Sequence, residues 1–127
     1  MDIICVDLPS RRNRYSLTYV VLSIKHQSRI YVRVYTDGAS SVPSIFNIFN
    51  SANWLEREIW DMFGVPFSGH PDLRRILTDY GFFGHPLKKD FPLTGFFEIR
   101  YDDTSRRIVS ESLNLIQELR LFFLNTA

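Results

Sequence analysis

The chain has 127 residues, which is enough for one hydrophobic core and too few for two ordinary independently folded domains. Fifteen basic and fourteen acidic residues leave a formal net charge of +1, so no overall field draws the chain to nucleic acid or anionic lipid. Aromatic residues make up 15% of the chain, and many lie in the second half, where periodicity is poor. These rings are available for burial in an irregular structure or an interface.

The single cysteine, Cys5, excludes an internal disulfide and a thiolate zinc cage, which fits a reducing compartment. No apolar run approaches the roughly 18 to 20 residues needed to span a bilayer, because hydroxyl residues interrupt the segment 15–24. The first five residues resemble neither a secretory signal nor a transit peptide. We therefore expect a soluble or peripheral chain.

Two runs rich in β-branched and aromatic residues, Tyr15–Lys25 and Ser28–Thr36, are separated by only two residues and predict an antiparallel hairpin. Side chains alternate in the second run as in a strand with one face against the core. After this hairpin, Ser41–Pro43 is predicted to begin a short helix that carries apolar residues at 45–49.

A second helix is predicted over Trp54–Phe63, with Asn53 as its N-cap, Glu56 at the capping-box position and Gly64 as its end. Its carboxylates at three-residue spacing raise the alternative of a metal or acid–base site. No Glu-x-x-His accompanies them, so a solvated face or an interface is the favoured interpretation. These carboxylates are Glu56, Glu58 and Asp61.

After Gly64, prolines and glycines interrupt every helical or strand pattern for some thirty residues that remain rich in large apolar side chains. Structureless segments of this length are uncommon in compact domains unless they are functional. We therefore expect another protein to shelter these rings. The large apolar residues are Phe67, Leu73, Ile76, Leu77, Tyr80, Phe82, Phe83, Leu87 and Phe91.

The last part of the chain is predicted to hold one short strand pair, Phe96–Tyr101 and Arg106–Val109, joined by a turn at 102–105. In the tail, Leu113, Ile116 and Leu119 keep a helical spacing, whereas Leu113 and Leu115 alternate as in an extended arm, so both alternatives stay open. We divide the chain into a truncated α+β domain at 1–65 and an extended partner-binding arm at 66–127.

Two further constellations are weak. His70, Asp72, His85 and Asp90 carry atoms that could bind metal but lack a recognised ligand spacing, which leaves a metal-dependent hydrolase as a remote alternative. Basic pairs interleaved with aromatic residues are typical of some RNA-binding α+β domains, but near-neutral charge disfavours that function. These pairs begin at Arg11, Arg74, Lys88 and Arg106.

Three motifs together resemble one family. They are Glu56-Arg57-Glu58-Ile59-Trp60-Asp61-Met62-Phe63-Gly64-Val65, then His70-Pro71-Asp72-Leu73-Arg74-Arg75-Ile76-Leu77-Thr78-Asp79-Tyr80-Gly81-Phe82, and Gly84-His85-Pro86-Leu87-Lys88-Lys89-Asp90-Phe91-Pro92. The chain is similar in these segments to subunit 9 of mitochondrial and proteobacterial complex I, the homologue of the bacterial C subunit.

The resemblance implies a peripheral-arm subunit on the matrix side of the mitochondrial inner membrane, or on the cytoplasmic face of a bacterial membrane. Such a subunit has no cofactor or catalytic residue of its own and docks on the large quinone-site subunit and the iron-sulfur subunits of NADH:ubiquinone oxidoreductase. Charge-assisted hydrogen bonds of the signature residues would fix the loop and its partner contacts. These residues are Glu56, Arg57, Glu58, Asp61, His70, Asp72, Arg74, Arg75, Asp79, Lys88, Lys89 and Asp90.

The family fold implied is α+β, a small antiparallel sheet with short helices followed by an extended irregular C-terminal arm. The family carries a strand and a helix before the position that matches Asp2, and we expect both to be absent here, so that either a separate chain supplies them or this lineage manages without them. The apolar tail at Leu121–Leu124 also departs from the polar ending of the family.

Overall fold

The computed structural model of this chain describes residues 1–122. Internal contacts divide the chain into two compact units, Met1–Phe91 and Pro92–Ala127. The predicted partner-binding arm starts at residue 66, so its first part lies within the first compact unit. The division into domains at residue 65 stays a prediction.

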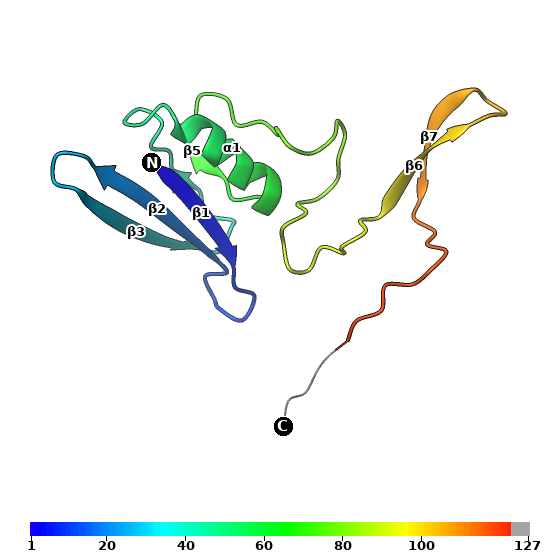
Figure 1. The fold of residues 1–127 in the computed structure, drawn as a ribbon, viewed down its shortest axis with the longest axis horizontal. Coiled ribbons are helices and arrows are strands. Elements are labelled where there is room, and N and C mark those ends of the chain that lie inside the picture. The colour runs from blue at the N-terminus through cyan, green and yellow to red at the C-terminus, as the bar shows by residue number, and fades with distance from the viewer. Residues whose placement is uncertain (123–127) are drawn as a thin grey trace. The chain divides into compact units, whose positions relative to one another are not determined.

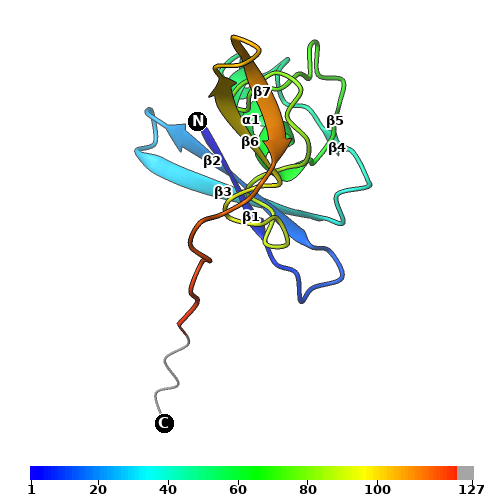
Figure 2. The ribbon, with the colours of Figure 1, turned by 90° about the vertical axis from the view of Figure 1, so that its right-hand side faces the viewer.

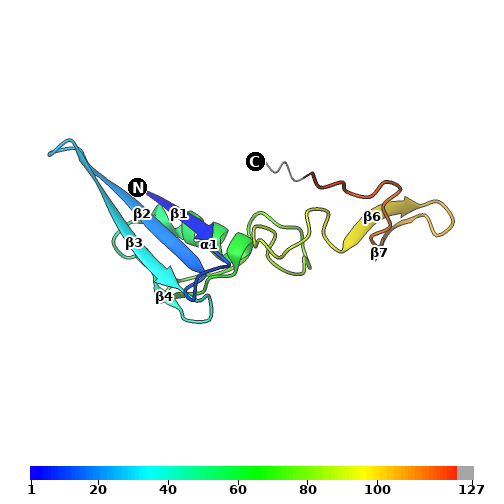
Figure 3. The ribbon, with the colours of Figure 1, turned by 90° about the horizontal axis from the view of Figure 1, so that it is seen from below.

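The first unit is built on a three-stranded antiparallel sheet in the order β1-β2-β3, seen side by side in Figures 1 and 3. The strands are β1 (Asp2–Asp7), β2 (Tyr15–Ser23) and β3 (Ser28–Thr36). The register confirms the predicted hairpin, since Tyr15 lies opposite Thr36 and Ser23 opposite Ser28. Because the residues alternate between faces, every second residue of β1 and β2 points toward the core, whereas Ile30 and Val32 on the same face of β3 are 59% and 50% exposed.

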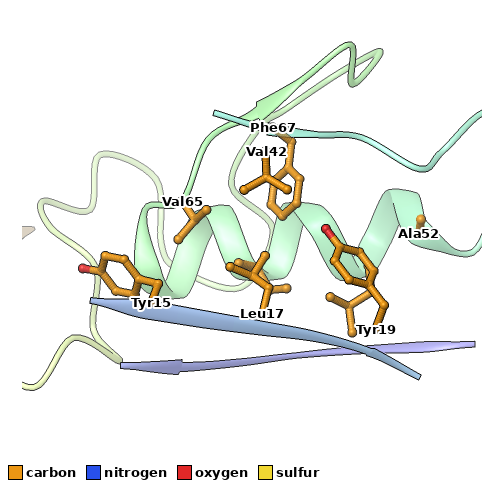
Figure 4. Close-up of a cluster of buried hydrophobic side chains, with 9 residues drawn as sticks. Tyr15, Leu17, Tyr19, Val42, Ala52, Val65 and Phe67 are labelled. Atoms are coloured by element: carbon orange, nitrogen blue, oxygen red, sulfur yellow. The ribbon is translucent and has the colours of Figure 1, made fainter. Parts of the chain in front are cut away.

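The core lies between this sheet and α1 (Ala52–Phe63). In Figure 4, Tyr15, Leu17 and Tyr19 point from β2 toward the helix, with Val65 near its C-terminal end. Leu17 and Val65 are completely buried, and Ile3 and Ile59 complete the contact between β1 and α1. The sheet face that carries these side chains is the inner face, and its burial is the main apolar contribution to stability.

The predicted short helix at Ser41–Pro43 is wrong. Val42 and Pro43 form the two-residue strand β4, which pairs in parallel with β5 (Phe67–Ser68), beside α1 in Figure 2. The Val42 amide donates to Pro66 O, and the Ser44 amide donates to Ser68 O. The segment is extended because its partner comes from a distant part of the chain, which local periodicity does not report.

Helix α1 begins earlier than predicted. Its N-cap is Ser51, whose side chain makes no capping hydrogen bond, and Asn53 lies within the first turn. Gly64 ends the helix as predicted, with φ of 75° in the left-handed region and its amide donating to Trp60 O at 2.9 Å.

The missing side chain of Gly64 also leaves space for the His85 ring, so substitution of this glycine is expected to destabilise the fold. A Cβ at this position would lie 2.6 Å from His85 Nε2, whereas one at Gly81, which has a similar φ of 70°, would meet nothing within 4 Å. Gly81→Ala is therefore expected to cost only the backbone strain of about 1 kcal/mol, and Gly64→Ala about 2 kcal/mol or more. Thermal unfolding of both variants measures the difference, and equal losses would contradict a close His85 contact.

The second unit contains an antiparallel hairpin of β6 (Phe97–Asp102) and β7 (Arg107–Ser112), which confirms the predicted strand pair. The Leu113 amide donates to Phe96 O beyond the last strand pair. Residues 114–122 form neither helix nor strand, so the helical alternative for this part of the tail is wrong. The rest of the apolar tail, from 123, lies outside the described residues.

The architecture of residues 1–122 is mostly sheet with one α-helix, which is compatible with the predicted α+β class. The sheets of the two units are small, and the longer segments at 69–96 have no regular structure. No helix in these residues is long and apolar enough to cross a membrane.

Candidate partner-binding loop

The carboxylate of Asp61 holds the segment that follows the first signature motif. Asp61 Oδ2 accepts hydrogen bonds from the backbone amides of Ile76, Leu77 and Thr78 at 2.8 to 3.1 Å. Asp61 Oδ1 accepts from Thr78 Oγ1 at 2.7 Å and from Arg75 Nη1 at 3.1 Å. We call this group the Asp61 clamp, defined as Asp61, Arg75 and residues 76–78.

The Asp61 side chain is completely buried, so its charge depends on these donors. Burial acts to raise the pKa of Asp61, but the hydrogen bonds from Thr78, Leu77 and Ile76 outweigh it and lower the pKa to about 2. The carboxylate therefore stays ionised at neutral pH and binds the three amides as an anion. The clamp is a structural anchor, because its donors all come from the chain itself.

The C-terminal end of α1 holds a second part of the same segment. His85 Nδ1 donates to Asp61 O at 2.9 Å, and the Leu87 amide donates to Met62 O at 3.1 Å. The His85 ring also packs edge-on against Trp60, with centroids 5.8 Å apart. These bonds satisfy helix carbonyls that have no partner within the helix. Arg75 Nη1 adds a bond to Gly84 O at 2.8 Å, which links the two anchor points.

Residues 77–87, which these anchors hold at both ends, form what we call the presented loop. A turn in which the Phe82 amide donates to Asp79 O shapes its tip, and the Tyr80 amide donates to Asp79 Oδ1. Tyr80 is 103% exposed and Phe83 is 76% exposed. Large apolar side chains with this exposure, on a backbone fixed by buried hydrogen bonds, are the arrangement expected of a preformed protein-binding surface.

Glu56 forms a separate buried anchor. Its side chain is completely buried, and its carboxylate accepts from Ser44 Oγ at 2.6 Å and from the Ile45 amide at 2.9 Å. His70 Nδ1 accepts from the Asp72 amide, which leaves His70 Nε2 to donate to Asn53 O.

The prediction that the helix carboxylates form a solvated face is wrong for Glu56 and Asp61. Both side chains are buried, because each accepts hydrogen bonds from donors in distant segments. The third carboxylate, Glu58, is exposed.

A third anchor includes two residues that the sequence analysis missed, Asp7 and Arg14. Arg14 donates to both carboxylate oxygens of buried Asp7 at 2.6 and 2.7 Å and to both of Asp90 at 3.0 Å. The Lys89 amide donates to Asp7 Oδ2 at 2.8 Å. The Arg14 bonds lower the pKa of Asp7 against the opposing effect of burial. Asp7 was recognisable, because it continues the inward register of Ile3 and Cys5.

The remaining signature residues, except Arg57, lie at or near the surface. Asp72 and Arg74 form an ion pair at 3.0 Å with both side chains more than half exposed, so it contributes little to stability. Buried Arg57 donates from Nε to Arg74 O at 3.2 Å. Lys88 is half-buried, and Asp79 and Lys89 are exposed. The structure thus places Glu56 close to His70 and Asp61 close to Arg75, and it holds Lys89 and Asp90 in the anchor of Asp7 and Arg14. Contacts of the signature residues with partner subunits stay a prediction.

Chemistry elsewhere in the described residues is limited. No three His, Cys, Asp or Glu side chains among residues 1–122 are grouped to hold a metal ion, and His70 and His85 serve different anchors. Burial and then the Asp7 charge raise the pKa of Cys5 to about 12, so its thiol is protonated at neutral pH.

The large apolar residues after Gly64 differ in burial, and Ile76, Phe82 and Phe91 are half-buried. Phe67 is 6% exposed within the chain's own core, and Leu73 packs against that core, so the expectation that another protein shelters these rings is wrong for both. Leu77, Tyr80, Phe83 and Leu87 are exposed. The candidate contact surface is therefore the presented loop rather than the whole segment.

Comparison with known proteins identifies the family. Residues 1–97 match the family described as the 30 Kd subunit of respiratory-chain NADH dehydrogenase. The chain is 57% identical over 122 residues to a subunit of the NADH-quinone oxidoreductase of Paramagnetospirillum magneticum, covering 96% of this chain and 61% of that one. It is 60% identical over 121 residues to NADH-ubiquinone oxidoreductase subunit 9 of Acanthamoeba castellanii, covering 95% of this chain and 61% of that subunit.

A third relative is the mitochondrial NADH-ubiquinone oxidoreductase 30.4 kDa subunit of Neurospora crassa, 56% identical over 121 residues, with 95% of this chain and 43% of that protein covered. The chain thus spans 43% to 61% of the lengths of these relatives. The family match covers most of the chain and includes β1, α1 and the presented loop. The chain therefore belongs to the family of the 30 Kd subunit of respiratory-chain NADH dehydrogenase.

Proposed function

We propose that this chain is a structural subunit of the peripheral arm of respiratory NADH:ubiquinone oxidoreductase, complex I. It braces the large quinone-site subunit and is needed for assembly and for electron transfer to quinone. The chain holds no cofactor and no catalytic residue, while NADH, FMN, iron-sulfur clusters and ubiquinone are bound by neighbouring subunits. It works on the matrix side of the mitochondrial inner membrane, or on the cytoplasmic face in a bacterium, and reaches the membrane only through the complex.

The observation that carries this proposal is the presented loop. Tyr80 and Phe83 are exposed, yet the backbone on either side of them is fixed by the Asp61 clamp and by the helix end. A rigid loop loses little conformational entropy when a partner covers it, and aromatic side chains dominate the binding energy of protein interfaces. The loop therefore fits a permanent subunit contact better than a site for a small molecule.

The hairpin of the second unit supports the same function. Phe97, Ile99, Tyr101 and Ile108 share one face and are each more than half exposed, while Arg100 pairs with Glu111 at 2.7 Å on the other face. A two-stranded hairpin is marginally stable alone in water, so a neighbouring subunit that covers the apolar face would stabilise it. A separate chain that adds a strand at the edge of β1 is also part of the proposal.

The test is incorporation of a loop variant into the native complex. Cells that express the wild-type chain together with Tyr80→Ser/Phe83→Ser are expected to incorporate the variant at least tenfold less, because two interface rings are lost. Mass spectrometry of the purified assembly measures the ratio of the two chains. Ile48→Ser is the matched control, since Ile48 is 74% exposed but lies outside the loop.

Thermal unfolding of the loop variant should match the wild type, because exposed side chains contribute little to folding. Equal incorporation of the wild-type and loop-variant chains would contradict a role for the loop. Native mass measurement that finds the wild-type chain alone, with no partner subunit, would contradict the subunit function itself.

A further inference from the structure

The sheet face opposite α1 is the second large apolar surface of the first unit. Register places Ile4 and Val6 of β1 on this face, together with Leu22 of β2 and Arg29, Tyr31 and Arg33 of β3. We call it the outer face. The helix packs on the inner face, and the four apolar residues of this group, with neighbouring Tyr35, are between 42% and 63% exposed. Exposed apolar side chains on all three strands of one sheet face indicate an interaction surface.

The charges on the outer face are unbalanced. Within residues 1–122, no carboxylate forms an ion pair with Arg29 or Arg33. Hydrogen bonding from Arg33, and then from Arg11, lowers the pKa of Tyr35, but a neutral tyrosine does not balance their charges. The face carries one carboxylate, Asp2, and that group accepts a bond from the adjacent backbone amide. The guanidinium groups of β3 are therefore available to carboxylates of a partner.

The outer face is also divided lengthwise. On this face β1 carries Ile4 and Val6, and β2 carries Val20 and Leu22 together with Ser16 and Thr18, whereas the β3 half alternates arginine with tyrosine. Three strands about 4.8 Å apart span roughly 10 Å, which matches the width of one α-helix. A helix that lies along the strands would place an apolar stripe on Ile4, Val6 and Leu22 and carboxylates beside Arg29 and Arg33.

Nucleic acid and lipid fit this face less well. The rings on this face, Tyr31 and Tyr35, are confined to β3, the outer-face residues of β1 and β2 offer no ring on which bases could stack, and Asp2 would oppose a phosphate backbone. The formal net charge of +1 for the whole chain gives no general attraction to an anionic membrane.

We propose that the outer face of β1–β2–β3 docks an amphipathic helix of another subunit, with an apolar stripe over β1 and β2 and an acidic edge along β3. This inference rests on the proposed subunit function but uses a different surface from the presented loop. The helix would bind by apolar burial, and its carboxylates would fix its orientation through charge-assisted bonds to Arg29 and Arg33.

The experiment has two parts on the native assembly. Phenylglyoxal modification of arginine, read by mass spectrometry, is expected to label Arg29 and Arg33 at least tenfold more slowly in the assembly than in the separated, non-denatured chain. Arg12, an exposed arginine of the β1–β2 connection, serves as the control with an equal rate in both. Then Arg29→Lys/Arg33→Lys is assembled and coupled with a carbodiimide, which joins an amine directly to a touching carboxylate.

The expected product is a crosslinked peptide from another subunit, with carboxylates on one edge of an apolar helical stripe. Equal labelling of Arg29 and Arg33 in both states would overturn the proposal. The proposal would also be overturned by a crosslink to this same chain or by a crosslinked peptide that lacks the apolar stripe with acidic edge. Protection of Arg29 and Arg33 that disappears after nuclease treatment would overturn it as well, because nucleic acid would then cover the face. These failures leave the subunit function standing if the chain still co-purifies with partner subunits, whereas a lone chain in native mass measurement would remove both.

Discussion

Asp61→Ala is expected to lower the free energy of unfolding by about 3–5 kcal/mol, because it removes the acceptor of five buried hydrogen bonds. The amides of Ile76, Leu77 and Thr78 would lose a shared partner, and the Arg75 guanidinium would lose its counter-charge. Since domains of this size are stable by only about 5–15 kcal/mol, the variant should unfold at a much lower temperature. Thermal unfolding followed by tryptophan fluorescence measures the loss.

Glu58→Ala is the matched control for this variant. Glu58 lies on the same helix but is exposed, so its loss should change the free energy of unfolding by less than about 0.5 kcal/mol. Equal stability of the Asp61 and Glu58 variants would contradict the clamp. The Asp61 variant should also give the presented loop faster amide exchange, which connects the buried anchor to the proposed contact surface.

The same carboxylate gives a pH dependence with a definite sign. The pKa of Asp61 falls from 3.8 to about 2 on folding, so the group stabilises the fold above its unfolded value. That contribution, roughly 2 kcal/mol, is lost as pH falls from about 4 to about 2. Asp61→Asn cannot titrate, so its stability should fall less steeply than the wild type over this range. Parallel acid curves for the two proteins would contradict the low pKa.

β2, β3 and the β6–β7 pair could be predicted from the sequence because their signals are local, whereas β1 was not predicted. Alternation of Ile30, Val32 and Val34 with polar or aromatic residues identified β3, and the two-residue gap before Ser28 identified its pairing with β2. β4 escaped prediction because a parallel bridge of two residues depends on Phe67 and Ser68, which lie far along the chain. No periodicity of Val42 and Pro43 encodes that partner.

The candidate site was predictable as a segment but not in its chemistry. The prolines and glycines after Gly64 indicated an irregular loop with large rings, and the structure places Tyr80 and Phe83 at its surface. The sequence placed Glu56 at the capping-box position and favoured a solvated face or an interface for the helix carboxylates, because most carboxylates in folded proteins are hydrated. Glu56 and Asp61 are both buried, because backbone amides from other segments replace that water.

Glu56→Ala is the second substitution with a large expected effect, a loss of about 3–4 kcal/mol in the free energy of unfolding. It leaves a cavity beside α1 and removes the acceptor of the Ile45 amide and of Ser44 Oγ. Alanine favours helix slightly more than glutamate, so backbone propensity does not contribute to the loss. Thermal unfolding gives its size, and amide exchange at Ile45 gives its location.

Two milder variants separate the causes of that loss. Glu56→Gln keeps one acceptor oxygen and most of the volume, so it should lose less than alanine, and Ser44→Ala removes a single donor and should cost about 1 kcal/mol. The loss of stability should therefore be largest for Glu56→Ala, smaller for Glu56→Gln and smallest for Ser44→Ala. This order is expected if the Glu56 carboxylate joins α1 to the preceding segment, in which Ser44 directly follows β4. Unchanged exchange at Ile45 in Glu56→Ala would show that the carboxylate is not its anchor.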